Sequence, residues 1–288
     1  MKNCTKTFII NDSQKQFMEK NYSTFENSNH NNYVEKFYKT KDWTLTIYKS
    51  QKAVLCGINI NRIKNELNLD LTKNEIGMDE VGVGDYYGGL VVCAVFLSKD
   101  DYKKINSLDI KDSKKLSDKQ IINIAQKLIN IVNFEVCQIF PNEYNYLYEK
   151  FKNTHIIKTI LHNNAVTNLI IKNQINKSTT NIILDEYVSQ SNYYKYLINA
   201  NIQNITQINE FKTKAESQHT SVACASIIAR YYFLKQIETL SRKVGIELPL
   251  GAWNDKVKDV STLILNKYGY DKLNELVKIH FKNTKKLI

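Results

Sequence analysis

The sequence has few prolines, few arginines and no long apolar run. Its 288 residues include 2 prolines and 5 cysteines, and no two cysteines form a Cys-x-x-Cys pair. An odd number of scattered cysteines supports neither a disulfide framework nor a structural zinc site, and a reducing, cytoplasmic compartment is expected. No run of about 18 apolar residues could span a membrane. The apolar patch at residues 8–10 is too short for a signal peptide.

The composition is that of a basic globular protein. Hydrophobic residues make up 43% of the chain, and Lys+Arg number 40 against 29 Asp+Glu, a formal net charge of +11. Such an excess favours a polyanionic partner. Arginine occurs only at Arg62, Arg230 and Arg242, however, and Asn, Ile and Tyr are abundant. This composition is typical of proteins from AT-rich genomes, which would account for part of the lysine excess, so charge alone does not identify a nucleic-acid-binding protein.

Patterning predicts a small α+β domain at residues 1–70. Residues 12–22 have helical character, and a further short helix is expected at 61–69. Between them, apolar and polar residues alternate in the manner of strands and turns. The predicted strands cover residues 33–38, 43–48 and 53–56. A polar linker near residue 70 separates this domain from the rest of the chain, residues 71–288.

The second domain reads as an α/β layout built on a mixed sheet. Two strands are expected around a glycine-rich turn, and Ser117 with Gln120 forms a capping box that begins a helix. A long helix is expected to begin at Glu216 and to end before Gly245. The predicted strands cover residues 76–80, 90–97, 134–140 and 181–184, and the helices 117–131, 154–172, 216–243 and 257 onward.

Glycine is concentrated beside two acids. Five of the 9 glycines fall within residues 77–89, directly around Asp79 and Glu80. Carboxylates beside an open backbone loop suit Mg²⁺ and a phosphate. A solvated hairpin turn would also be rich in Gly and Asp. The spacing Gly-x-Gly-x-x-x-Gly and the strand that follows do not fit a dinucleotide-binding fingerprint.

Two further acids stand at ends of predicted elements. Asp185 ends the apolar run 182–184, and Glu216 begins the predicted long helix. Each has an ordinary alternative, since Asp185 could cap a turn and an acid at a helix N-terminus is favoured by the helix dipole. Successive strand residues point to opposite faces. Asp79 and Glu80 can therefore share a site only if the chain bends there or if one acts from the side.

Five separated motifs of the second domain, and one turn of the first, resemble those of bacterial ribonuclease HIII. Residues 78–88, Met-Asp-Glu-Val-Gly-Val-Gly-Asp-Tyr-Tyr-Gly, are similar to its Asp-Glu-Val-Gly-Thr-Gly-Asp-Tyr-Phe-Gly signature. The other matching segments are 111–116, 213–230, 248–252 and 280–284. Residues 48–52 resemble the Tyr-x-Ser-Gly-Lys turn of that family's N-terminal TBP-like domain. Three positions depart from the pattern: Val83 replaces Thr, Gly89 replaces Pro and Gln51 replaces Gly.

The resemblance implies a ribonuclease H-like mixed sheet flanked by helices, with a small N-terminal α+β TBP-like domain. It implies an endoribonuclease that hydrolyses the RNA strand of RNA–DNA hybrids with two Mg²⁺ or Mn²⁺ ions, leaving 5′-phosphate and 3′-hydroxyl ends. The metal ligands and catalytic residues would be Asp79, Glu80, Asp185 and Glu216. The expected substrate contacts are Gly82, Val83, Gly84, Ser113, Lys114 and Lys115, with Tyr48, Lys49 and Lys52 from the N-terminal domain.

Some alternatives stay open at this point. An enzyme of the ribonuclease HII type would cut at single embedded ribonucleotides, although Glu in place of Asp at position 216 follows the HIII pattern. A non-catalytic hybrid-binding protein would be expected to lack one of the four acids. Trp43 could belong to a binding face or to the core. His219, one turn beyond Glu216 on the predicted helix, could assist phosphate binding or proton transfer, although a structural hydrogen bond is the favoured role. His162 and His280 are expected to be structural. A cytoplasmic monomer without membrane contact is expected.

Overall fold

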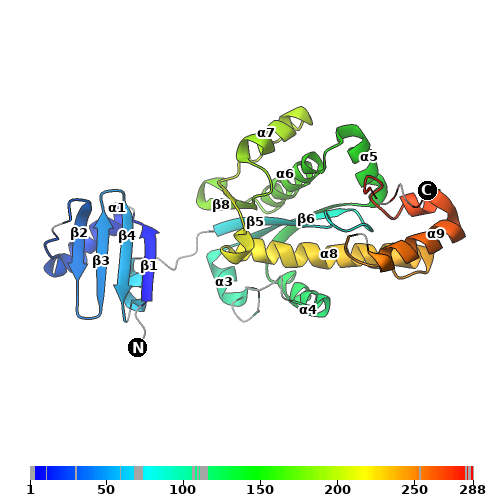
Figure 1. Ribbon diagram of the computed structural model, residues 1–288. Coiled ribbons are helices and arrows are strands. Elements are labelled where there is room, and N and C mark those ends of the chain that lie inside the picture. The colour runs from blue at the N-terminus through cyan, green and yellow to red at the C-terminus, as the bar shows by residue number, and fades with distance from the viewer. Residues whose placement is uncertain are drawn as a thin grey trace. The chain divides into compact units, whose positions relative to one another are not determined.

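The computed structural model describes residues 4–10, 12–29, 31–58, 60–67, 74–105, 108, 110, 116–252, 254–282, 284 and 287. The chain divides into two compact units, Met1–Thr72 and Lys73–Ile288 (Figure 1). Each unit has its own sheet and its own hydrophobic core.

The N-terminal unit is a four-stranded antiparallel sheet with helices on one face. Its strand order is β1-β4-β3-β2. Along β3, Trp43, Leu45 and Ile47 are buried while the alternate residues are partly exposed, so only one face of the sheet contributes to the core. Trp43 therefore belongs to the core. The elements are β1 (Cys4–Ile9), α1 (Asp12–Tyr22), η1 (Ser23–Phe25), β2 (Val34–Lys39), β3 (Trp43–Tyr48), β4 (Lys52–Gly57) and α2 (Asn61–Glu66).

Three of these strands agree with the sequence prediction, and β1 was not predicted. Strand β1 pairs with β4 at the edge of the sheet. Because residues 4–7 are all exposed, neither face of this part of the strand requires apolar side chains. The sequence there lacks the alternation of apolar and polar residues from which a strand is recognised.

The C-terminal unit is built on a five-stranded mixed sheet of order β7-β6-β5-β8-β9. Strands β5, β6 and β7 are antiparallel neighbours, whereas β8 and β9 run parallel to β5. The carboxyl ends of the three parallel strands therefore meet at one edge. The strands are β5 (Asn74–Val81), β6 (Leu90–Leu97), β7 (Asn133–Ile139), β8 (Thr180–Asp185) and β9 (Glu210–Lys212).

Helices cover both faces of this sheet (Figure 1). Helices α5 (Pro141–Phe151), α6 (Thr154–Lys172) and α7 (Gln190–Asn199) pack on the face to which Ile76 and Met78 of β5 point. Helices α3 (Lys99–Ile105), α4 (Asp118–Leu128), α8 (Thr220–Val244) and α9 (Asp255–Asn274) pack on the opposite face. A Cβ atom on Gly77 would lie 2.2 Å from the Val222 nitrogen, so glycine there allows α8 to pack directly against β5.

The capping box and the end of the long helix are confirmed, but the start of that helix is different. Ser117 and Gln120 cap each other's backbone N–H groups at the start of α4, and Gly245, with φ 64°, ends α8. Helix α8 begins at Thr220, not at Glu216. Glu216 lies in the preceding 3-10 turn η4 (Ala215–Ser217), because the chain turns at Lys214, whose φ is 56°. Helices α3, α5 and α7 and strand β9 were not predicted.

The C-terminal residues close the unit. Helix α9 is interrupted at Gly269, and the chain after it returns to the glycine-rich loop, where the Lys278 nitrogen donates to the Tyr86 carbonyl. Within the described residues, no helix combines the length and the apolar character that crossing a bilayer requires.

The β3–β4 turn contains a residue that the backbone disfavours. Gln51 has φ 62°, in the left-handed region, and stands where the TBP-like pattern has glycine. Its nitrogen donates to the Tyr48 carbonyl, and its own carbonyl accepts from Ile10. A side chain in this conformation costs roughly 1 kcal/mol relative to glycine.

We expect Gln51→Gly to stabilise the N-terminal unit by about 0.5–1 kcal/mol, because glycine adopts this φ without steric conflict. Urea unfolding of the full chain, followed by tryptophan fluorescence, measures the change. Gln51→Ala is the control, since alanine keeps the Cβ atom. Equal stability of the glycine and alanine variants would show that the turn is not strained.

Candidate active site

Three of the four predicted acids approach one another on the α8 side of the sheet. Met78 of β5 pairs with Leu184 of β8, which places the following residues, Asp79 and Asp185, beside each other at the sheet edge. The Ala215 nitrogen donates to Asp185 Oδ1 at 3.0 Å, and this bond holds the η4 turn, with Glu216, against the end of β8. A parallel strand pair and one turn thus gather acids that are far apart in the chain.

The pKa values of Asp79 and Asp185 are both raised. Burial raises the pKa of Asp79 to about 7, aided by the neighbouring charge of Glu80 and opposed by hydrogen bonds from Ser226 and the Glu80 nitrogen. Burial also raises the pKa of Asp185 to about 6, and Glu216 adds a hydrogen bond and a like charge. Such shifts are expected where carboxyl groups are crowded with little solvent. A divalent cation would relieve the repulsion.

Glu80 reaches the opposite face of β5 and contacts helix α6. Its Oε1 is ion-paired with Lys158 Nζ, and its Oε2 lies 2.9 Å from His162 Nε2. Burial opposes ionisation of Glu80, but the hydrogen bond from His162 and the charge of Lys158 outweigh it and lower the pKa of Glu80. Since Asp79 and Glu80 are consecutive in the strand, their side chains lie on different faces, as the alternation requires.

The donor atoms suit a hard divalent cation. Four carboxylates offer the oxygen ligands that Mg²⁺ and Mn²⁺ prefer. Within the part of the chain that the structure describes, no three His, Cys, Asp or Glu side chains are arranged so that they could hold an ion as they stand. In this arrangement both oxygens of Glu80 are engaged by side chains of α6.

The glycine-rich loop 82–89 is packed tightly at most of its glycines. Gly82 has φ 106°, and a Cβ atom there would lie 2.6 Å from the Gly89 carbonyl oxygen. A Cβ atom on Gly89 would lie 2.0 Å from the Ile139 carbonyl oxygen. At Gly84, by contrast, a Cβ atom would meet no atom within 4 Å. Packing therefore accounts for most of the glycine cluster and leaves the open backbone at Gly84 unexplained.

A buried lysine anchors the glycine-rich loop 82–89 from the protein interior. Lys278, which is fully buried, donates from Nζ to the carbonyl oxygens of Asp85 at 2.6 Å and Gly88 at 2.7 Å. Asp85 Oδ1 in turn accepts from the Gly251 nitrogen at 2.7 Å. Burial lowers the pKa of Lys278 to about 7, an effect that the charge of Asp85 opposes. The loop is thus anchored to the segments on either side of α9.

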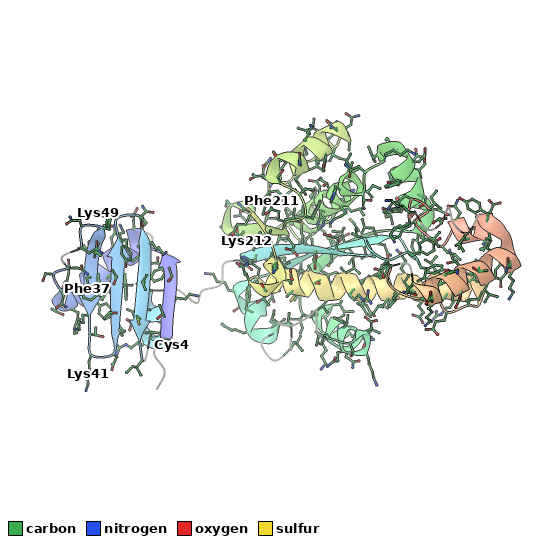
Figure 2. All side chains as sticks on the ribbon, in the orientation of Figure 1. Cys4, Phe37, Lys41, Lys49, Phe211 and Lys212 are labelled. Carbon is green, nitrogen blue, oxygen red and sulfur yellow. The ribbon has the colours of Figure 1, made fainter. Side chains whose placement is uncertain are left out.

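The remaining predicted contacts lie in three places. Val83 packs against the apolar cluster on the α6 side of the sheet. Lys49 and Lys52 are exposed at the β3–β4 turn of the N-terminal unit, and Tyr48 is half-buried beside them; Figure 2 shows Lys49 at one end of that sheet. Ser113, Lys114 and Lys115 lie outside the described residues.

Comparison with known proteins identifies the family. Residues 76–284 match the family described as Ribonuclease HII. Ribonuclease HIII of Phytoplasma mali is 40% identical, over 99% of this chain and 98% of its own length. That of Ureaplasma parvum is 38% identical, over 98% of this chain and 88% of its own length. The chain belongs to the ribonuclease HIII family.

Solved structures agree with this assignment. A Bst-RNase HIII structure, described as a complex with Mn²⁺, aligns with a TM-score of 0.72 at 29% identity, covering 99% of this chain and 98% of that one. Ribonuclease H2 from Pyrococcus horikoshii shares the fold with a TM-score of 0.60 at 23% identity, over 74% of this chain. The predicted family and the mixed α/β fold are confirmed. Membership of the ribonuclease HIII family makes the chain a ribonuclease H, a phosphodiester hydrolase.

Sequence reasoning missed the contacts that two side chains of α6 make with Glu80. His162 was expected to be structural, and it is fully buried, but its contact with Glu80 was not foreseen and Lys158 was not considered. These two residues are four apart, so they lie on one face of the helix. That spacing was the available signal. It is weak, because a Lys and a His four residues apart are common on ordinary helices.

The ring nitrogens of His219 have partners outside the carboxylate cluster, which consists of Asp79, Asp185 and Glu216. It stands at the N-cap of α8, not one helical turn beyond Glu216. Its Nδ1 lies 3.3 Å from Glu75 Oε1, and its Nε2 lies 3.3 Å from Lys212 Nζ. Ser221 also donates to Glu75, at 3.1 Å. His219 therefore belongs to a polar network that begins at the amino end of β5.

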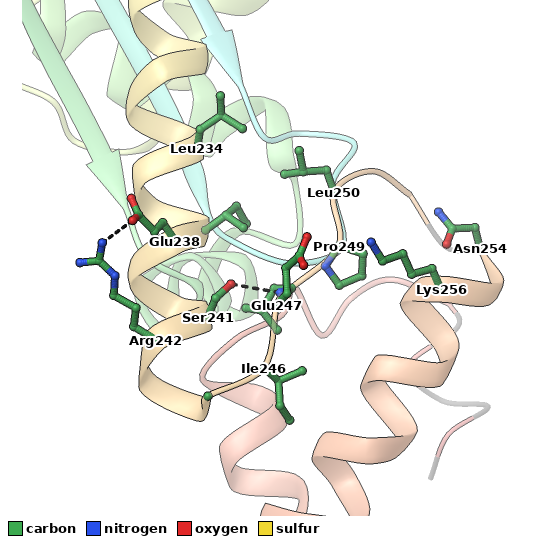
Figure 3. Close-up of a pocket in the computed structure, with 13 residues that line it drawn as sticks. Leu234, Glu238, Ser241, Arg242, Ile246, Glu247, Pro249, Leu250, Asn254 and Lys256 are labelled. Carbon is green, nitrogen blue, oxygen red and sulfur yellow. Dashed lines mark hydrogen bonds and ion pairs between the residues drawn. The ribbon is translucent and has the colours of Figure 1, made fainter. Parts of the chain in front are cut away.

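A separate apolar pocket lies at the far end of α8. Its volume is about 770 Å³, and it lies between the last turns of α8 and the start of α9 (Figure 3). An ion pair between Glu238 and Arg242 and a hydrogen bond from the Leu248 nitrogen to Ser241 Oγ border it. None of the four acids lines this pocket.

Proposed function

We propose that this chain hydrolyses the RNA strand of RNA–DNA hybrids, with Asp79, Glu80, Asp185 and Glu216 as ligands of two Mg²⁺ or Mn²⁺ ions. The convergence of Asp79, Asp185 and Glu216 from two strands and a turn carries this proposal. The Mn²⁺ named for Bst-RNase HIII supports the choice of ion. Bound divalent ions supply activation of the attacking water and stabilisation of charge on the leaving oxygen.

The fold itself contributes to catalysis by holding carboxylates close together at the edge of the mixed sheet. Asp79 and Asp185 are held as neighbours by strand pairing, and the Ala215 N–H group orients Asp185. In the metal-free protein, burial above all, together with neighbouring like charges, raises the pKa values of these two acids. Deprotonation of both acids is therefore coupled to binding of the ions. Cleavage would leave 5′-phosphate and 3′-hydroxyl ends.

The open backbone at Gly84 suits close approach of the RNA strand. We assign Gly82, Val83 and Gly84 the role of reading the 2′-hydroxyl through backbone groups, because this hydroxyl distinguishes RNA from DNA. Val83 lacks the hydroxyl of the family's threonine, so contact through the backbone is the remaining means. Ser113, Lys114 and Lys115 would hold phosphates of the hybrid.

We assign the N-terminal unit, proposed as TBP-like, a role in binding the hybrid. The face of its sheet away from the helices is left partly exposed, and it includes Tyr48 and Phe37. Lys49 and Lys52 are exposed at the β3–β4 turn, and Figure 2 shows Lys49 at that end of the sheet. Aromatic and basic side chains together are typical of nucleic-acid-binding surfaces. We also propose a cytoplasmic monomer. The five cysteines are scattered along the chain and include no Cys-x-x-Cys pair, which supports a reducing compartment.

Asp79→Asn tests the metal-dependent reaction. We expect cleavage of an RNA–DNA hybrid to fall by more than about 100-fold, the upper figure for losing a residue that only supports a metal ligand. Binding of the hybrid should be retained. Glu149→Gln, which changes an exposed acid on α5, is the matched control. Turnover by Asp79→Asn in Mg²⁺ or Mn²⁺ would refute the assignment. A duplex with one embedded ribonucleotide, assayed in parallel, distinguishes an enzyme of the HII type.

Gly84→Ala tests the approach of the substrate to the loop. Because a Cβ atom there meets nothing within 4 Å, the thermal stability should be unchanged. Cleavage of the hybrid should fall about tenfold or more if the RNA backbone occupies that space. Gly82→Ala is the contrasting variant, since its positive φ and close contact predict a loss of stability. Full activity of Gly84→Ala would place the RNA elsewhere.

Lys49→Ala combined with Lys52→Ala tests the N-terminal unit. Each phosphate contact contributes about 0.9 to the slope of log affinity against log salt. We therefore expect weaker hybrid binding and a slope that is smaller in magnitude by about one to two. Lys41→Ala, at the β2–β3 turn, is the matched control for loss of positive charge (Figure 2). An unchanged slope in the double variant would exclude these lysines from the interface.

A further inference from the structure

Lys158 is a buried cation whose partners are unusual for a structural lysine. Its exposure is 5%, and among the described residues Glu80 is its only ion-pair partner. Its Nζ also lies 3.7 Å from the centre of the Tyr187 ring. A buried charge requires compensation. Here the compensation comes from a single carboxylate oxygen and an aromatic face, both beside the carboxylate cluster.

The aromatic partner is itself held in place. Tyr187, two residues after Asp185, has its hydroxyl 2.8 Å from Thr159 Oγ1 of α6. Its ring stacks on His162, with ring centres 5.4 Å apart. The face of a tyrosine ring attracts an ammonium group without directional hydrogen bonds. Lys158 therefore has a second stabilising contact that remains if the contact with Glu80 is weakened.

The two oxygens of Glu80 have different partners, and only one of these partners carries a full positive charge. Oε2 lies against the buried ring of His162, a neutral donor in the Nε2–H tautomer, which can keep this bond while Glu80 binds an ion. Oε1 faces the full positive charge of Lys158. A divalent cation that shares Glu80 must approach this ammonium or displace it, and two cations near one carboxylate repel each other.

We propose that Lys158 is the resident counter-ion of Glu80 in the metal-free protein and competes with the divalent cation for it. This inference rests on the proposed role of Glu80 as a metal ligand. Lys158 holds the Glu80 side chain in place before metal arrives, and it weakens the affinity of the site for metal as a consequence. Lys158 is thus a positioning residue. When a metal ion binds Glu80, the ammonium group of Lys158 keeps its contact with the Tyr187 ring.

Calorimetric titration of the full-length chain with Mn²⁺ tests the proposal. Lys158→Met should bind Mn²⁺ about tenfold more tightly than the unmodified chain, because one competing charge is removed. Lys158→Arg, which keeps the charge, should bind as the unmodified chain does. Lys172→Met is the matched control, because this exposed lysine on the same helix pairs with Glu135, away from the cluster. Unchanged or weaker Mn²⁺ binding by Lys158→Met would overturn the proposal.

Glu80→Gln separates this inference from the proposed function. If Glu80 is a ligand, Glu80→Gln weakens Mn²⁺ binding, and Lys158→Met then brings no further gain in the Glu80→Gln background. A gain that persists there would mean a general charge effect and would contradict the competition. Unchanged Mn²⁺ binding by Glu80→Gln alone would instead refute Glu80 as a ligand. Circular dichroism checks folding, and Lys158→Gln replaces Lys158→Met if that variant unfolds.

Discussion

Repulsion between carboxylates at the edge of the mixed sheet is the constraint around which the C-terminal unit is arranged. Strand pairing forces Asp79 and Asp185 to be neighbours, and the bond from Ala215 adds the turn that contains Glu216. Burial and like charge raise the pKa values of both aspartates. A fold stabilised only for itself would avoid such a cluster. Its presence is a mark of function, because strained electrostatics concentrate where charge is to be used.

The acids on the two faces of the sheet are stabilised by different kinds of partner. On the α8 side, the acids are stabilised by neutral donors, the Ser226 side chain and backbone N–H groups. On the α6 side, Glu80 meets a full positive charge and a buried imidazole. The two consecutive acids on opposite faces of β5 therefore have pKa values that are shifted in opposite directions, upward for Asp79 and downward for Glu80. In the proposed site, Glu80 would therefore have to act from the side, because its side chain lies on the other face of the strand from Asp79.

The sequence predicted the elements that alternate clearly and missed those that do not. Strands β3 and β4 and the capping box at Ser117 were found because their patterns are local. The start of α8 was misplaced because the left-handed Lys214 is invisible in composition. The acids could be named from motifs. Their grouping could not be derived, since it depends on strand order, and the partners of Glu80 come from a helix about 80 residues away in the chain.

The glycine cluster illustrates why a motif needs a structure. In the sequence, its five glycines look alike, and all could be assigned to a ligand. In the fold, Gly77 lets α8 pack on β5, and Gly82 and Gly89 relieve contacts with backbone oxygens. Packing reasons therefore cover these three, while Gly84 has free space around it. The open position lies in a loop that Lys278 anchors from the buried side, so the backbone that faces solvent is held still. An anchored, open backbone beside acids is what recognition of a strand through its sugar hydroxyls requires.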